Sequence, residues 1–130
     1  MAERIAFKGM TPSQAATITH EQYLELICSR NRRSIKRNSM DYRKLTEKVE
    51  KFKKNNTGKA VRTHLREAVI LPSWIGMKFE VHDGKEFKQL VITANMLDHR
   101  LGEYAYSTKR VLHSAPGIRA TRGSKFLAVK

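Results

Sequence analysis

Five cationic side chains fall within eight residues of the sequence, at Arg30, Arg32, Arg33, Lys36 and Arg37. No acidic residue lies among them, so ion pairs one helical turn apart cannot neutralise the run. Four of the five are arginines, whose planar guanidinium binds phosphate through two parallel hydrogen bonds and stacks on exposed bases. The run therefore predicts contact with a polyanion and favours RNA over an acidic protein. A solvated helix face is the alternative.

A second group of cations lies in the last part of the chain, which contains no acidic residue after Glu103. Small residues such as Gly117 and Gly123 separate these cations, and they let a backbone approach a phosphate ridge closely. We predict an extended arm that binds RNA and is disordered when free, with an ordinary loose terminus as the alternative. The complete set of predicted RNA-binding residues is Arg30, Arg32, Arg33, Lys36, Arg37, Arg62, His64, Arg66, Lys109, Arg110, His113, Arg119, Arg122 and Lys125.

The patterns that would indicate catalysis or metal binding do not occur. Gly117 and Gly123 are separated by five residues, where a phosphate-binding P-loop needs four, and Ser-Lys follows in place of Lys-Ser. The five histidines lie 14 to 44 residues apart, without the spacing of a zinc site. We therefore expect no enzyme activity, no metal and no cofactor.

The chain carries 26 basic and 12 acidic residues, a net charge of +14, which indicates a strongly anionic partner. Residues 1–61 carry 14 basic and 6 acidic side chains, residues 62–106 carry 6 of each, and residues 107–130 carry 6 basic and none acidic. This uneven distribution predicts one domain in three parts: a basic N-terminal region at 1–61, a folded core at 62–107 and a basic tail at 108–130. The residue patterns within each part predict that the first part is helical, the core α+β and the tail extended.

Three other functions remain compatible with a basic composition. A DNA-packaging protein would bind duplex DNA as tightly as structured RNA, so a competition assay separates it. A nucleic-acid-modifying enzyme would need an acid/base or metal constellation that the sequence does not offer. A membrane-surface binder would need a large apolar face beside the basic one, and the basic run lacks that face.

Cys28 is the only cysteine, so the chain has no internal disulfide. It follows Leu24, Leu26 and Ile27 in a helical pattern, which predicts a reduced, partly buried packing residue; a reactive thiol or a lone metal ligand is the alternative. The chain has no apolar stretch long enough to cross a membrane, and its first residues lack the apolar run of a signal peptide. These features predict a cytoplasmic protein without a membrane partner.

The N-terminal region is expected to be helical. Thr19 and Gln22 have the spacing of a capping box, which predicts a helix start. Ser39 precedes a second helical pattern, which ends near Asn55 to Gly58. The apolar stripe of that second helix is Tyr42, Leu45, Val49 and Phe52.

The central region is expected to form a small sheet. Residues 78–82 alternate, Asp83-Gly84 has the composition of a type I′ turn, and residues 86–92 favour a second strand. Residues 103–107 alternate like a third strand, whereas Ala68 to Leu71 suits either a helix or a buried strand. The predicted fold class is α+β, a small three-stranded sheet with helices packed on one face.

The central region resembles the small-subunit ribosomal protein S-nineteen family, known as S-fifteen in eukaryotic naming. The matching motifs are Asp83-Gly84-Lys85, then Ile92 and Leu97, then Leu101-Gly102-Glu103-Tyr104. The segment from Thr63 to Pro72 and the residues around His113 and Pro116-Gly117-Ile118 resemble the archaeal and eukaryotic form. Two departures are Asp98, where many members have Gly, and Ser73-Trp74-Ile75-Gly76, which replaces the more familiar Glu-Met-Val-Gly.

The resemblance implies a structural place in the head of the small ribosomal subunit, bound to its ribosomal RNA. It also implies pairing with the neighbouring ribosomal protein of the S-thirteen family. A further implication is that the C-terminal tail extends toward the decoding region, where it approaches transfer RNA.

Overall fold

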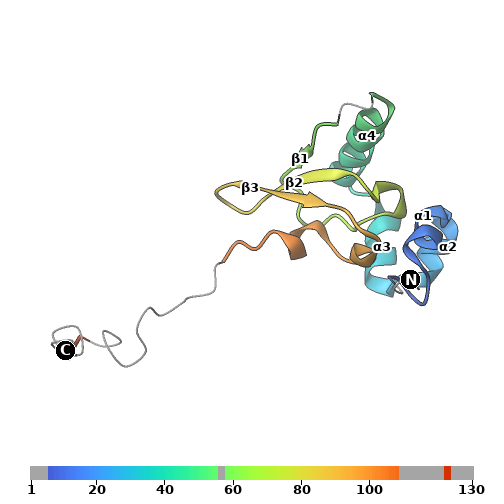
Figure 1. Ribbon diagram of the computed structural model, residues 1–130, viewed down its shortest axis with the longest axis horizontal. Helices are drawn as coiled ribbons and strands as arrows, with labels where there is room; N and C mark the ends of the chain where they lie inside the picture. Colours follow the sequence, from blue (N-terminus) through green and yellow to red (C-terminus); the bar gives the residue numbers. More distant parts are fainter. Residues whose placement is uncertain (1–5, 56–57, 109–121, 124–130) are drawn as a thin grey trace.

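In the described part of the chain, four helices precede a three-stranded sheet (Figure 1). The computed structural model describes residues 6–55, 58–108 and 122–123. The elements are α1 (Pro12–Thr17), α2 (His20–Leu26), α3 (Ser29–Arg37), α4 (Met40–Asn55), β1 (Val61–Thr63), β2 (Lys78–His82) and β3 (Phe87–Val91), with short 3-10 helices η1 (Pro72–Trp74), η2 (Ala94–Met96) and η3 (Leu101–Tyr104). This arrangement confirms the α+β prediction.

Helices α2 and α4 begin where the sequence predicts. The Thr19 side chain accepts from the Gln22 backbone N–H, and the Gln22 side chain accepts from the Thr19 N–H, which completes the capping box of α2. The Tyr42 N–H donates to Ser39 Oγ at 3.4 Å at the start of α4. Tyr42, Leu45 and Val49 are buried along α4, so the predicted stripe faces the core.

The sheet has the order β1-β2-β3, with β1 parallel to β2 and β2 antiparallel to β3. The predicted hairpin is confirmed, but its type I′ turn is wrong. Such a turn needs a positive φ at both central residues, and only Gly84 has one, at +108°. Four residues connect the strands, and Asp83 Oδ1 accepts from the Lys85 and Glu86 N–H groups at 2.9 and 2.8 Å. These backbone hydrogen bonds, with Glu86 contributing most, lower the pKa of Asp83 to about 2.

The third strand is β1, and the strand predicted at residues 103–107 is wrong. Residues 101–104 form η3 instead, because Leu101 and Ala105 are both buried while the residues between them follow a helical turn and not an extended path. Ala68 to Leu71 is neither helix nor regular strand. It runs as a buried segment with one bridge, between Val69 and Arg100, and Pro72 then starts η1.

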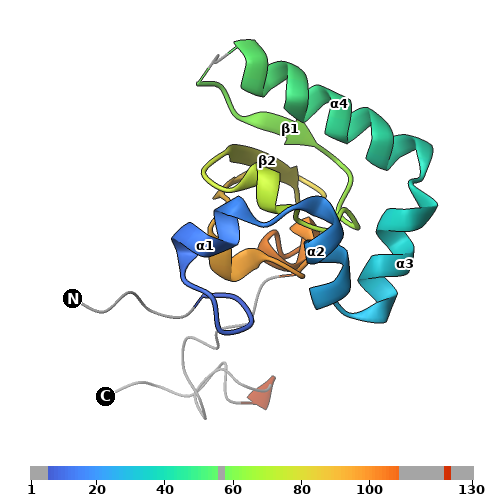
Figure 2. The same cartoon turned by 90° about the vertical axis from the view of Figure 1, so that its right-hand side faces the viewer.

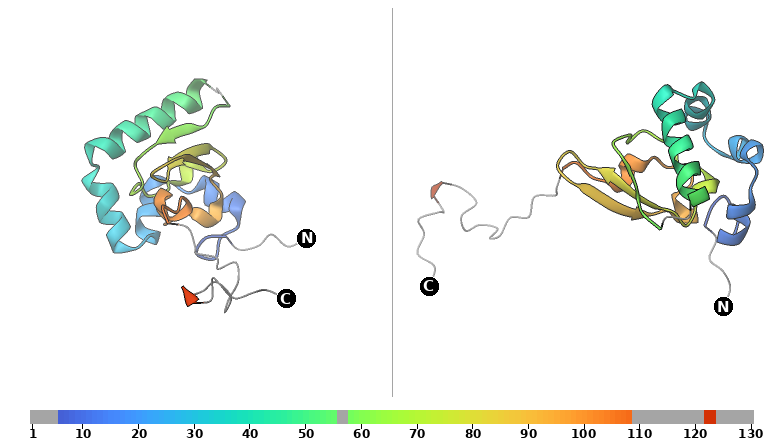
Figure 3. Two further views of the ribbon diagram at one scale, coloured as in Figure 1. Left: turned by 90° about the vertical axis from the view of Figure 1, so that its left-hand side faces the viewer. Right: turned by 90° about the horizontal axis from the view of Figure 1, so that it is seen from above.

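Trp74 lies at the centre of the core and is 1% exposed. Its ring centroid is 5.3 Å from that of Phe79 in β2 and 6.3 Å from that of Tyr42 in α4. The buried hydrophobic cluster runs from Phe7 to Ala105, so the helices and the sheet share one core. Figure 2 shows α4 beside β1, with α3 running down from the start of α4. The right-hand view of Figure 3 shows the β2–β3 connection at the end of the sheet that points away from the helices.

Candidate nucleic-acid interface

The cations of α3 point in two directions. Asn31 and Ile35 form its buried face, with 6% and 7% exposure. Arg32 turns toward the end of α2, where its guanidinium donates to the Ile27 carbonyl at 3.1 Å and the Glu25 carbonyl at 3.4 Å. A cation suits that position because the C-terminal end of a helix carries a partial negative charge. Arg32 therefore fastens α3 to α2.

The remaining four cations of α3 are exposed. Arg30, Arg33 and Arg37 share one face because three or four residues separate them, and Lys36 lies on the outer side. Within residues 6–55, 58–108 and 122–123, none of the four forms an ion pair. Their positive charge is therefore uncompensated by the fold, as the sequence predicts for a polyanion-binding helix.

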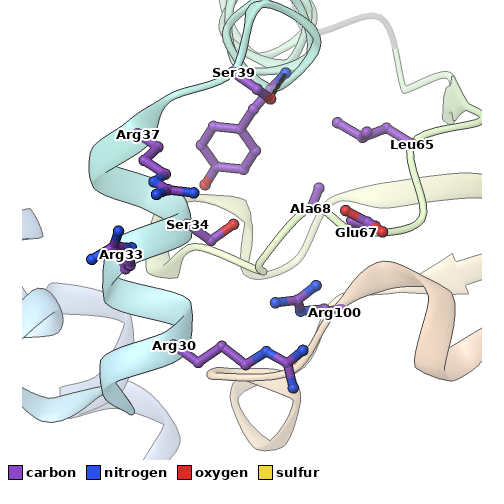
Figure 4. Close-up of a pocket in the computed structure, with 10 residues that line it drawn as sticks. Arg30, Arg33, Ser34, Arg37, Ser39, Leu65, Glu67, Ala68 and Arg100 are labelled. Atoms are coloured by element: carbon purple, nitrogen blue, oxygen red, sulfur yellow. Dashed lines mark hydrogen bonds between the residues drawn. The ribbon is translucent and has the colours of Figure 1, made fainter.

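The arginine face of α3 borders a hollow of about 330 Å³ (Figure 4). Arg100, from the segment before η3, reaches into it from the opposite side. The lining residues are Arg30, Arg33, Ser34, Arg37, Ser39, Tyr42, Leu65, Glu67, Ala68 and Arg100. The fold thus gathers four guanidinium groups around one space, which is a suitable arrangement for phosphate.

Sequence reasoning missed Arg100, because it lies in the part of the chain with no net charge and outside any basic run. The structure holds it in place through Asn31. The Arg100 guanidinium donates to Asn31 Oδ1 at 3.5 Å, and Asn31 Nδ2 donates to the Asp98 carbonyl and carboxylate at 2.7 and 2.8 Å. No local pattern could have revealed the pairing of Arg100 with Asn31, since the two residues are 69 positions apart.

Asp98 connects the start of α3 to the segment before η3. Its φ of +64° lies in the left-handed region, which Gly adopts freely and Asp tolerates better than most residues. The first turn of α3 has no side-chain cap of its own, and the Asp98 carboxylate accepts from the Cys28 N–H at 3.4 Å. Asp98 therefore compensates for its strained backbone by supplying an acceptor at the helix N-terminus.

Cys28 is exposed at the N-terminal boundary of α3, which corrects the prediction of a partly buried packing residue. The helical pattern was misleading because α2 ends at Leu26 and a new helix, α3, starts at Ser29.

Tyr23 holds the same region from inside the core. It is fully buried, and its hydroxyl donates to the Ile70 carbonyl at 2.7 Å and accepts from the Asp98 N–H at 3.1 Å. Burial raises the pKa of Tyr23 to about 12, so the hydroxyl keeps its proton and remains a donor at neutral pH. Tyr23 thus satisfies two backbone groups that would otherwise be unpaired.

Replacement of Asp98 by Ala should lower the free energy of unfolding by about 1.5 to 3 kcal/mol, because two hydrogen bonds at the start of α3 are lost and a left-handed φ is imposed on Ala. Asp98→Gly removes the same bonds but suits the backbone, so its loss should be about 1 kcal/mol smaller. Urea denaturation of both variants measures the difference. Equal losses would contradict the strain assigned to this position.

Arg66 has a structural task in addition to its predicted RNA contact. Its guanidinium donates to the carbonyls of His82, at 2.7 Å, and Gly102, at 3.2 Å, and to that of Ala105. The Gly102 N–H donates back to the Arg66 carbonyl at 2.8 Å. A Cβ at Gly102 would lie 3.0 Å from both Arg66 Cβ and the Arg66 carbonyl oxygen, which explains why the smallest residue stands there.

Arg62 and His64 lie near the hairpin. The Arg62 guanidinium forms an ion pair with Glu80 and lies over the Phe87 ring, 5.3 Å from its centroid. The exposed His64 ring packs against the rings of His82 and Phe87, with centroids 4.4 and 5.2 Å apart. Both residues also line a groove between α4 and β1 that includes Lys44 and Lys48.

The groove and the arginine hollow adjoin each other at Leu65. A third hollow also includes Leu65, together with His64, Arg66, Glu67, Arg100, Gly102 and Glu103. We call the three hollows together the Leu65 surface. It brings the predicted residues Arg30, Arg33, Arg37, Arg62, His64 and Arg66 onto one continuous region, joined by the unpredicted Lys44, Lys48 and Arg100.

The other predicted residues lie elsewhere. Arg32 and Lys36 line an open hollow on the outer side of α3, which Ser29, Arg30, Arg33 and Arg37 also line. Arg122 is exposed. Lys109, Arg110, His113, Arg119 and Lys125 lie outside the described residues.

Across the described part of the chain, no cluster of three or more His, Cys, Asp or Glu suits a metal ion, and no helix is long and apolar enough to cross a membrane.

Comparison with known proteins identifies the family. Residues 33–113 match the family model described as ribosomal protein S19. The small ribosomal subunit protein uS19 of Saccharolobus solfataricus is 42% identical over 126 residues, which cover 95% of this chain and 90% of the relative. That relative is archaeal, in agreement with the predicted archaeal or eukaryotic type. The chain therefore belongs to the ribosomal protein S19 family, a family of structural ribosomal proteins without catalytic activity.

Proposed function

We propose that the Leu65 surface and the outer side of α3 bind ribosomal RNA in the head of the small ribosomal subunit. Membership of the family makes the chain a structural, RNA-binding constituent of that subunit. The observation that carries the proposal is the set of exposed α3 arginines with no ion pair in the described residues, facing Arg100 across one hollow. Such charges are stabilised best by phosphate, which accepts two hydrogen bonds from each guanidinium.

The proposal assigns different tasks to the three parts of the chain. Residues 1–61 supply the basic helix face, residues 62–107 position it, and residues 108–130 extend toward the decoding region and approach transfer RNA. The neighbouring ribosomal protein of the S-thirteen family is the proposed protein partner. The role of the tail is supported by its charge, because it carries six basic side chains and no acidic one. The approach of the tail to the decoding region and the pairing with the S-thirteen protein are supported by the resemblance to the family.

The test uses small ribosomal subunits from which this protein has been removed by a high-salt wash. The full chain and a chain ending at Ser107 are rebound, and short cross-linkers identify their neighbours. The shortened chain should fold, because it keeps the whole described core from Phe7 to Ala105, but it should rebind roughly 10-fold or more weakly as six cations are lost. Only the full chain should cross-link to transfer RNA.

Cross-links to the S-thirteen protein should persist in both chains. Rebinding of the shortened chain with full affinity would contradict the role of the tail, and the absence of S-thirteen cross-links would contradict the pairing. A competition between duplex DNA and ribosomal RNA for the full chain addresses the DNA-packaging alternative, which requires equal affinities.

A further inference from the structure

Among the described residues, Glu67 is the one acidic residue that lines the arginine hollow, and it also lines the third hollow of the Leu65 surface. Its side chain is exposed. No hydrogen bond or ion pair joins the Glu67 carboxylate to any residue in the described part of the chain, although four arginines border the same space. A carboxylate in that position repels phosphate. A ligand that carries hydrogen-bond donors as well as an anionic group therefore suits this hollow better than phosphate alone.

The hollow has the size of a small-ligand site. Its volume of about 330 Å³ lies at the lower end of the roughly 300 to 1,000 Å³ that such pockets occupy. Leu65, Ala68 and Tyr42 contribute its apolar part, and Ala68 and Tyr42 are buried, with 2% and 8% exposure. Figure 4 shows Glu67 across the space from α3, while Arg30 extends from α3 toward the Arg100 side. Phosphate-binding, apolar and acceptor groups thus border one space.

An unstacked RNA nucleotide carries a group that suits each of these three kinds of lining residue. Its phosphate suits the arginines, its base ring suits an apolar surface or a guanidinium plane, and the edge of its base presents N–H donors. Guanine offers two adjacent donors, N1–H and the N2 amino group, which can bind the two oxygens of one carboxylate. Uracil offers a single N–H beside two carbonyl acceptors, and those acceptors would be repelled by Glu67.

We propose that the arginine hollow binds one unstacked nucleotide of the RNA, with its phosphate against Arg30, Arg33 and Arg37 and its base edge against Glu67, and that it prefers guanine. This inference rests on the proposed function, because it names the nucleotide that the RNA-binding surface selects. Arg100, held by Asn31, lines the opposite side of the hollow and supplies a planar group for stacking.

The test measures binding of the full chain to four single-stranded heptanucleotides of uridine whose central position is guanosine, cytidine, adenosine or uridine. The guanosine oligomer should bind roughly 5 to 10-fold more tightly than the all-uridine oligomer. This ratio of affinities lies in the lower part of the range expected for a bidentate contact with a base. In the Glu67→Gln variant that preference should disappear, because the amide offers one acceptor and one donor in place of two acceptors. Affinity for the all-uridine oligomer should remain unchanged or rise.

The matched control is Glu50→Gln, which removes the same charge from an exposed position on α4 outside the Leu65 surface, and it should keep the guanosine preference. Equal binding of the four oligomers by the unmodified chain would overturn the inference. An equal gain for all four in Glu67→Gln would also overturn it, since Glu67 would then only repel phosphate. In either of these two contradicting results, the all-uridine oligomer would still bind in a salt-dependent way. Failure of the proposed function would instead abolish binding of every oligomer.

Discussion

Affinity of the full chain for its ribosomal RNA should fall by roughly 10³ to 10⁵-fold when the salt concentration rises from about 50 to 200 mM, if about 6 to 10 phosphates are contacted and the DNA-derived relation is taken as a guide. The physical reason is the release of counterions from the RNA when cationic side chains replace them. The net charge of +14 and the exposed cations of α3 supply enough positive groups for this number of contacts.

The salt dependence is measured by titrating labelled RNA at several salt concentrations and plotting the logarithm of affinity against that of the concentration. The chain should remain folded over this range, because its described core is apolar and shared between the helices and the sheet. A nearly flat plot would contradict binding through phosphate contacts.

Simultaneous replacement of Arg30, Arg33 and Arg37 by Gln should weaken RNA binding by roughly 10² to 10³-fold, given about 1 to 1.5 kcal/mol for each arginine whose contact with phosphate is removed. The slope of the logarithm of affinity against the logarithm of salt concentration should decrease in magnitude by about three, one for each phosphate contact that is lost. The fold should be retained, because the three side chains are exposed and form no ion pair in the described residues, and Gln is a good helix former. Circular dichroism and thermal unfolding check that point.

The chain offers a matched control on α4. Lys51, Lys53 and Lys54 are also exposed cations, and they lie outside the Leu65 surface. Their joint replacement by Gln removes the same charge, so it should reduce affinity through the long-range field alone, by less than about 10-fold. Equal losses in the two triple variants would show that total charge, and not the position of the α3 arginines, determines binding.

Local signals in the sequence predicted several elements correctly. Thr19 and Gln22 located the start of α2 because a capping box depends on residues only three positions apart. The hairpin was predictable from alternating residues on both sides of Asp83-Gly84, although the turn type was not, since it depends on how the two strands twist together. The basic run at α3 was identified because its charges are adjacent in the sequence.

Features that depend on distant contacts were not predictable in this way. β1 is only three residues long and is specified by parallel pairing with β2, 18 residues further along. The alternation at residues 103–107 resembled a strand, but Arg66 binds the carbonyls of Gly102 and Ala105 and holds that segment in a different shape. Arg100 joins the site only through Asn31, a partner that no local pattern encodes.

The central claim is that the arginine face of α3 binds ribosomal RNA within the small subunit. Its most direct test is rebinding of the Arg30, Arg33 and Arg37 triple variant to salt-washed small ribosomal subunits, measured by co-sedimentation beside the Lys51, Lys53 and Lys54 control. We predict that the control sediments with the subunits at near-normal occupancy and that the arginine variant stays in the supernatant. Rebinding of the arginine variant at the same occupancy as the control would contradict the claim.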